Sequence, residues 1–78
     1  MEGRILVVED DRAILVALSE KLRIEGFEVA VAADGEAARD RLAEARPDLV
    51  ILDLMLPKLD GLSVLRWIRR RDARLPVL

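Results

Sequence analysis

The chain has 78 residues, of which 53% are hydrophobic and 36% charged, and its net charge is −2. This length allows one small domain, and the composition is typical of a globular protein and not of a disordered one. Cysteine and histidine do not occur, which excludes disulfides, thiolate metal sites and any phosphohistidine formed on this chain. The near balance of 13 basic and 15 acidic side chains argues against a chain-wide nucleic-acid surface.

The apolar segments are short. The longest, residues 5–8 and 49–52, have far fewer residues than a span of the bilayer requires. The first four residues lead straight into a strand-like run and lack the apolar segment and cleavage site of a signal peptide. We therefore expect a cytoplasmic protein with no membrane partner.

The first half of the chain alternates strand-like and helix-like segments. Residues 5–8 form a continuous aliphatic run, which is typical of a strand buried on both faces. A helix is predicted over residues 12–25, because apolar residues recur there at helical spacing and Gly26 follows at the position of a C′ glycine. Residues 27–32 alternate with a period of two and predict a second strand. The apolar stripe of the first helix consists of Ile14, Leu15, Leu18 and Leu22.

The second half continues this alternation. A helix is predicted over residues 36–45, a second buried strand over 49–52, and a loop over 54–59. A third helix is predicted from Asp60-Gly61 to Arg71, and residues 76–78 begin another strand. Strict alternation of apolar strands and helices predicts a parallel sheet with helical crossovers.

Acidic residues follow both buried strands directly. Glu9 and Asp10 end the first strand, and Asp53 ends the strand over residues 49–52. Open parallel sheets bind ligands beyond the carboxyl ends of their strands, at a switch point, so neighbouring strands would bring these carboxylates into one crevice. Each pair of carboxylates at ~4 Å would repel by roughly 4 kcal/mol at an effective dielectric of about 20. A hard divalent cation such as Mg²⁺ would relieve that repulsion.

A simpler interpretation of these acids stays open. Asp10 or Asp11 could cap the helix that follows, and Asp53 could be an ordinary polar residue closing a strand. The occurrence of acids after both fully apolar runs favours a shared metal site.

Three segments together resemble the receiver domain of two-component response regulators. The resemblance covers the whole chain and is closest to regulators that carry a DNA-binding output domain. It implies a flavodoxin-like α/β fold, an open parallel sheet with helices on both faces and strand order 2-1-3-4. The segments are Ile5-Leu6-Val7-Val8-Glu9-Asp10-Asp11, Leu49-Val50-Ile51-Leu52-Asp53-Leu54-Met55-Leu56-Pro57 and Asp60-Gly61.

The resemblance also implies the roles of the site residues. Asp53 would be the phosphoacceptor, and Mg²⁺ would be held by Glu9, Asp10, Asp53 and the backbone carbonyl of Met55. The phosphoryl group would come from a sensor histidine kinase, and DNA would be contacted through an output domain outside this chain. Family members often have two aspartates where this chain has Glu9-Asp10, and a leading glutamate is a familiar variant.

By the same resemblance, residues 1–78 would form a receiver domain that is incomplete at its C-terminus. The family's five-stranded domain has a Ser or Thr after strand 4 and a Lys after strand 5, and Lys58, in the loop after the third strand, does not replace that lysine. The helix that packs beside the first helix would also be missing. We expect part of the first helix or of the third strand to be exposed, with marginal stability or self-association as the result.

Two enzyme classes that also place functional groups after an apolar strand fit this sequence less well. A dinucleotide-binding enzyme would need G-x-G-x-x-G after the first strand, where residues 9–12 contain no glycine. A phosphatase of the haloacid-dehalogenase type would need D-x-D, but Met55 stands at the second position. A pseudo-receiver, an unphosphorylated interaction module, remains the alternative, although the intact acidic set speaks against it. The arginines that end the third helix are interpreted as a solvated face that complements the helix dipole.

Overall fold

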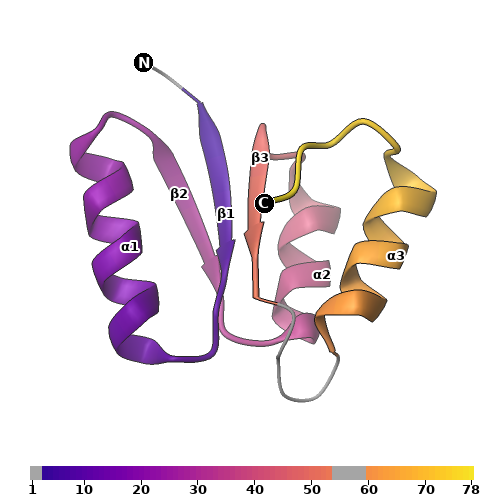
Figure 1. The fold of residues 1–78 in the computed structure, drawn as a ribbon. Helices are drawn as coiled ribbons and strands as arrows, with labels where there is room; N and C mark the ends of the chain where they lie inside the picture. The colour runs from indigo at the N-terminus through magenta and orange to yellow at the C-terminus, as the bar shows by residue number, and fades with distance from the viewer. Residues whose placement is uncertain (1–2, 54–59) are drawn as a thin grey trace.

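The computed structural model describes residues 3–53 and 60–78 (Figure 1). The predicted order of strands and helices is confirmed, and each boundary lies within about one residue of its predicted position. The elements are β1 (Arg4–Val8), α1 (Arg12–Ile24), β2 (Glu28–Ala32), α2 (Gly35–Glu44), β3 (Leu49–Leu52) and α3 (Gly61–Arg71).

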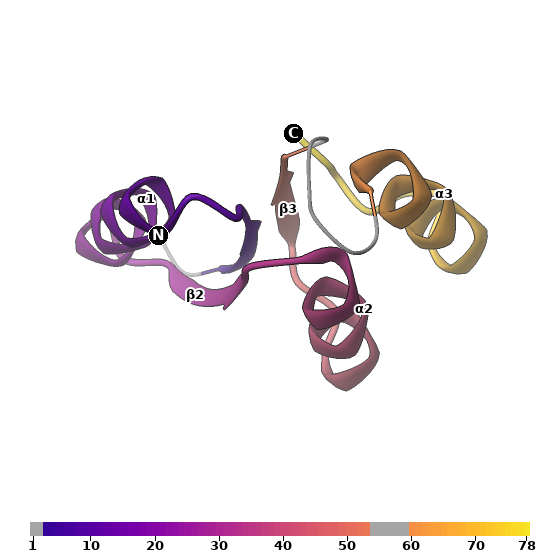
Figure 2. The same cartoon turned by 90° about the horizontal axis from the view of Figure 1, so that it is seen from below.

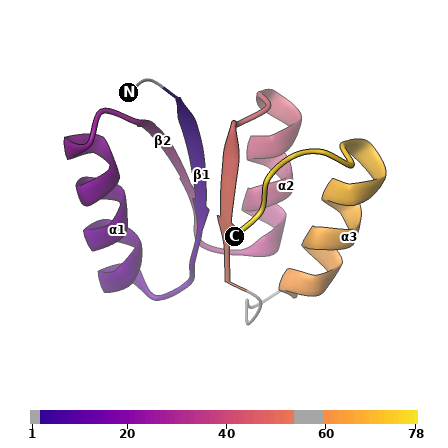
Figure 3. The same ribbon diagram turned by 45° about the horizontal axis from the view of Figure 1, so that its top comes forward.

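The sheet is parallel, and β1 lies at its centre in the order β2-β1-β3. The last residues of the chain return to the free side of β3 (Figure 3). There the Val50 N–H donates to the Pro76 carbonyl at 2.9 Å, and the Leu78 N–H donates to the Val50 carbonyl at 2.8 Å. A parallel bridge joins Val50 and Val77. The expected order 2-1-3-4 is therefore confirmed, with the fourth position occupied by the start of a strand.

Helices cover both faces of the sheet, as expected for a flavodoxin-like fold. Viewed along the strands, α1 lies on one side, and α2 and α3 lie on the other (Figure 2). In the described part of the chain, none of the helices has the length and apolar character that crossing a membrane requires.

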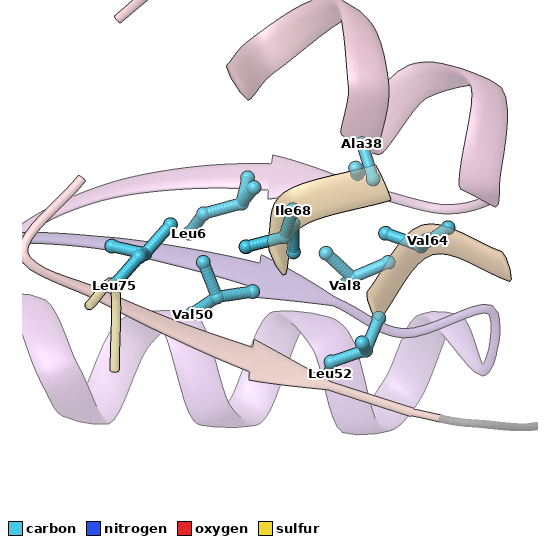
Figure 4. Close-up of a cluster of buried hydrophobic side chains, with 9 residues drawn as sticks. Leu6, Val8, Ala38, Val50, Leu52, Val64, Ile68 and Leu75 are labelled. Atoms are coloured by element: carbon cyan, nitrogen blue, oxygen red, sulfur yellow. The ribbon is translucent and has the colours of Figure 1, made fainter. Parts of the chain in front are cut away.

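The main core lies between the sheet and the pair α2–α3 (Figure 4). Every second residue of β1 and β3 points into it, and the helices contribute small or branched side chains. All four residues of β1 from Ile5 to Val8 are buried, because the central strand is covered on both faces. This confirms the interpretation of that apolar run. The buried cluster consists of Leu6, Val8, Ala32, Ala38, Val50, Leu52, Val64, Ile68 and Leu75.

The face of the sheet that carries α1 is less completely covered. In the apolar stripe of α1, Leu15, Leu18 and Leu22 are half-buried. Ile14, which belongs to the same stripe, is 51% exposed, in agreement with the expectation that part of the first helix would be exposed. The helix α1 contacts β1 and β2, and Leu15, Leu18 and Leu22 are the residues of the stripe that are partly covered there. In β3, Leu49 and Ile51 are also only half-buried, which confirms the expected exposure on this side of the sheet.

Candidate functional site

Backbone hydrogen bonds hold the carboxyl ends of the three strands together. The Asp53 N–H donates to the Val8 carbonyl at 3.0 Å, and the Glu9 N–H donates to the Ala32 carbonyl at 3.0 Å. The parallel pairing therefore continues one residue beyond β1 and β3. This places the first residue after each strand at one edge of the sheet, where α1 and the segment after β3 begin.

The three acidic residues predicted to form the site are brought together at this edge. Glu9, Asp10 and Asp53 each offer one carboxylate oxygen, and these oxygens all lie within 4.8 Å of one another. The side chains of Glu9 and Asp53 are half-buried and that of Asp10 is exposed. The site is therefore open to solvent on one side and shielded by the sheet on the other.

The neighbouring Asp11 has a different role. Its Oδ1 accepts hydrogen bonds from the N–H groups of Ala13, at 3.0 Å, and Ile14, at 3.2 Å, as the N-cap of α1. Capping satisfies backbone donors that the first turn of a helix leaves without partners. The question left open by the sequence is thus resolved: Asp11 caps the helix and Asp10 joins the acidic cluster.

The close approach of the carboxyl groups changes the pKa of Glu9. The pKa of the Glu9 carboxyl is raised, first because the protonated form can hydrogen-bond to the Asp53 carboxyl, and then because burial disfavours the charged form. The negative charge of Asp53 adds to the rise, whereas hydrogen bonds from the backbone N–H groups of Asp11 and Asp10 oppose it. Two carboxyl groups at this distance compete for one proton unless a cation lies between them.

The residues present fit a magnesium ion. Oε2 of Glu9 is buried and has no hydrogen-bond partner within residues 3–53 and 60–78. A buried carboxylate oxygen without a partner is costly, and a cation coordinated by it would remove that cost. The donors are all hard oxygens, which select Mg²⁺ or a similar ion over softer metals. Met55, whose carbonyl was predicted as a further ligand, lies outside the described residues, as does Lys58.

The start of α3 is fixed close to this edge by Asp60, the N-cap of the helix. Its Oδ1 accepts from the Ser63 N–H at 2.9 Å and its Oδ2 from the Ser63 hydroxyl at 3.0 Å. These two hydrogen bonds lower the pKa of Asp60. The sequence predicted a helix start at Asp60-Gly61 but not the part played by Ser63, although a serine three residues after a capping aspartate is a detectable signal.

Comparison with known proteins identifies the family and the fold of this chain. A family model described as the response regulator receiver domain matches residues 5–78. The response regulator MprA of Mycolicibacterium vanbaalenii is 49% identical over 78 residues, which are all of this chain and 34% of that protein. MprA of Mycobacterium tuberculosis is 47% identical over the same length. The chain thus spans about a third of the length of these relatives.

Solved structures with the same fold include two informative examples. NtrX from Brucella abortus superimposes with a TM-score of 0.93 at 37% identity, over 99% of this chain and 18% of that one. The response regulator TrrA from Thermotoga maritima, solved in complex with Mg²⁺-BeF, gives a TM-score of 0.90 at 39% identity, over 99% of this chain and 66% of that one.

Proposed function

This chain belongs to the response regulator receiver domain family, and from that premise we propose that Asp53 accepts a phosphoryl group with Mg²⁺ as cofactor. The observation that carries the proposal is the convergence of the Glu9, Asp10 and Asp53 carboxylates within 4.8 Å at the ends of two neighbouring strands. An aspartate that only closed a strand would not need two further acids from another strand beside it.

Each acid has a distinct task in this proposal. Glu9 and Asp10 would hold the ion from the end of β1, and Asp53 would both contribute to holding it and supply the oxygen that reacts. The carbonyl of Met55 is a further proposed ligand. When bound, Mg²⁺ neutralises negative charge on the carboxylates and on the incoming phosphoryl group. The complex of TrrA with Mg²⁺-BeF supports this choice of ion.

The transfer itself requires little more than positioning. An oxygen of Asp53 attacks the phosphorus of a phosphohistidine, the P–N bond breaks, and the imidazole leaves with the electron pair of that bond. The product is an acyl phosphate on Asp53, which water later hydrolyses to restore the carboxylate. The hydrogen bond from the Asp53 N–H to Val8 fixes the backbone of the nucleophile relative to β1. The chain is in this view a signalling domain that is itself the substrate, not an enzyme with a separate one.

The partners follow from the same proposal. Response regulators take their phosphoryl group from sensor histidine kinases, so the proposed donor is a phosphohistidine on such a kinase; the lack of histidine in this chain fits that proposal. The relatives are about three times as long as this chain, so an output domain joined to the receiver is proposed to contact DNA.

Intact-mass measurement tests the proposal. The protein is incubated with Mg²⁺ and acetyl phosphate or phosphoramidate, and we expect a mass gain of one phosphoryl group that EDTA prevents. Asp53→Asn should abolish the gain. Asp40→Asn, which removes an exposed acid from α2, should leave it unchanged. An adduct that persists in Asp53→Asn would refute the assignment. A longer protein that contains this domain together with its remaining strands, and that binds Mg²⁺ but takes no phosphoryl group, would favour the pseudo-receiver.

A further inference from the structure

Strand β2 lies at the edge of the sheet and pairs, within the described residues, with β1 alone. The Glu28 N–H and the Ala32 carbonyl point toward β1, where they bond to Gly3 and Glu9. Along a strand, the backbone N–H and C=O groups of successive residues point alternately to one side and to the other within the plane of the sheet. Those of Val29 and Val31 therefore point away from β1, toward the open edge. An edge of this kind is a template for pairing with another strand.

The sequence of this edge favours such pairing. The segment Phe27-Glu28-Val29-Ala30-Val31-Ala32-Ala33 contains one charge, no proline and no glycine. Short segments with high strand propensity and low charge are the ones that add to strands of other molecules. The side chains on β2 do little to prevent this, because Val and Ala are small and uncharged.

Two arginines from opposite faces of the sheet occupy the outward carbonyls. Arg23, in the last turn of α1, donates from Nη2 to the Val29 carbonyl at 3.3 Å. Arg41, on α2, donates from Nε to the Val31 carbonyl at 3.3 Å. Both hydrogen bonds are made to backbone carbonyls and not to side chains of β2. Both outward acceptors of the strand are therefore taken by cations that an approaching strand would have to displace.

The position of Arg41 is itself supported. Its Nη1 donates to Oε1 of Glu44 at 3.2 Å, one turn further along α2. A cavity of about 490 Å³ lies between this end of α2 and β2, and its lining includes Ala30, Val31, Arg41 and Glu44. The side chain of Arg41 lines this space and reaches the edge of the sheet at the Val31 carbonyl.

We propose that Arg23 and Arg41, by occupying the outward carbonyls of β2, prevent a second copy of this chain from pairing with this edge as an added strand. The partner surface is the same edge of the other molecule, because two identical edges related by a two-fold axis pair as antiparallel strands. Each arginine both occupies an acceptor and adds a positive charge that would face the same charge on the partner. The proposal concerns the β2 edge, on the opposite side of the sheet from residues 76–78, and does not depend on phosphorylation.

The test compares two double variants with the same change in charge. Arg23→Gln/Arg41→Gln removes the two guanidinium groups at the β2 edge, whereas Arg66→Gln/Arg70→Gln removes two exposed arginines from α3. Molar mass is measured by light scattering over a range of concentrations. We expect the molar mass of the first variant to approach twice that of the wild type at the same concentration, while the α3 variant keeps the molar mass of the wild type.

Hydrogen exchange identifies the surface used. In a dimer joined through this edge, the amides of Val29 and Val31 gain protection, because they become donors to the partner strand. A variant that stays monomeric at every concentration overturns the proposal. So does association without new protection at Val29 and Val31, which would indicate unfolding or another interface. If the double variant does not fold, Arg41→Gln alone is judged by the same two measurements.

Discussion

Glu9 and Asp53 follow two different strands, β1 and β3, yet a carboxylate oxygen of one lies within 4.8 Å of a carboxylate oxygen of the other. Their proximity raises the pKa of Glu9, and Oε2 of Glu9 is buried without a hydrogen-bond partner in the described part of the chain. Holding both carboxyl groups ionised at this distance therefore costs free energy. The arrangement becomes favourable when a proton or a cation is shared between the two groups.

The first prediction concerns pH. Since the pKa of Glu9 is raised by folding, its protonation contributes stability below the unfolded-state value of 4.5. That contribution is lost as the pH rises through the folded-state pKa. Urea unfolding of the metal-free protein should show this loss, and Glu9→Gln should remove it, whereas Glu20→Gln on the exposed side of α1 should not. Mg²⁺ should raise the stability of the wild type at neutral pH; equal effects of Mg²⁺ on wild type and Glu9→Gln would contradict the assignment.

The adjacent residues Asp10 and Asp11 should separate metal binding from stability. Asp11→Ala removes the N-cap of α1 and should cost about 1 kcal/mol of unfolding free energy, with little change in Mg²⁺ affinity. Asp10→Ala should do the reverse, because its carboxylate belongs to the acidic cluster. Calorimetric titration with Mg²⁺ and urea unfolding measure the two effects. If both variants lose the same property, the division of roles is wrong.

The core between the sheet and α3 should dominate stability. Ile68 is 1% exposed, and Ile68→Ala leaves a cavity in the main core, for which about 2–5 kcal/mol is expected. Leu62→Ala is the matched control, because Leu62 is on the same helix and 51% exposed. We expect its effect to lie within about 0.5 kcal/mol of the wild type. Similar losses in the two variants would mean that α3 is not packed as described.

The single tryptophan offers a local probe of α3. The guanidinium of Arg71 lies 4.6 Å from the centroid of the Trp67 ring, and that of Arg39, from α2, lies at 5.3 Å. Arg71→Gln should shift the fluorescence emission to longer wavelength, because water replaces the cation over the ring, and should cost about 0.5–1 kcal/mol. Arg70→Gln on the same helix is the control. Identical spectra for the two variants would show that the stacking is absent in solution.

Asp72 should give the opposite pH dependence to Glu9. Its pKa is lowered, first by the ion pair with Arg46 and then by the hydrogen bond from the Arg74 N–H. The stability it contributes is present above the unfolded-state value of 3.8 and is lost as the pH falls through the lower folded-state pKa. Asp72→Asn should therefore reduce the slope of acid unfolding. If the dependence of the unfolding free energy on pH at acidic pH is unchanged in Asp72→Asn, solvent screens the Asp72–Arg46 pair and the predicted contribution is absent.

Much of the fold could be predicted because the relevant signals are local. Four successive apolar residues in β1 and in β3 indicate strands covered on both faces, and the prediction held fully for β1, whose two neighbours and two layers of helices bury it. Gly26 at φ 100° ends α1 as its position in the sequence suggested. The alternation of strands and helices then restricts the topology to a parallel sheet, for which the comparisons confirm the receiver fold.

The amino-acid sequence by itself determined the elements, the family resemblance and the acidic residues that follow each buried strand. Tertiary structure decided which of those acids meet. It turned Asp10 toward Glu9 and Asp53, gave Asp11 to the helix, left Ile14 in solvent and placed Arg23 and Arg41 on the edge of β2. The spacing of apolar residues shows which face of a helix or strand is apolar, because that face is buried whatever partner the element packs against. Distances between side chains on different elements depend on strand order and helix placement, and these arise only when the whole sheet is assembled.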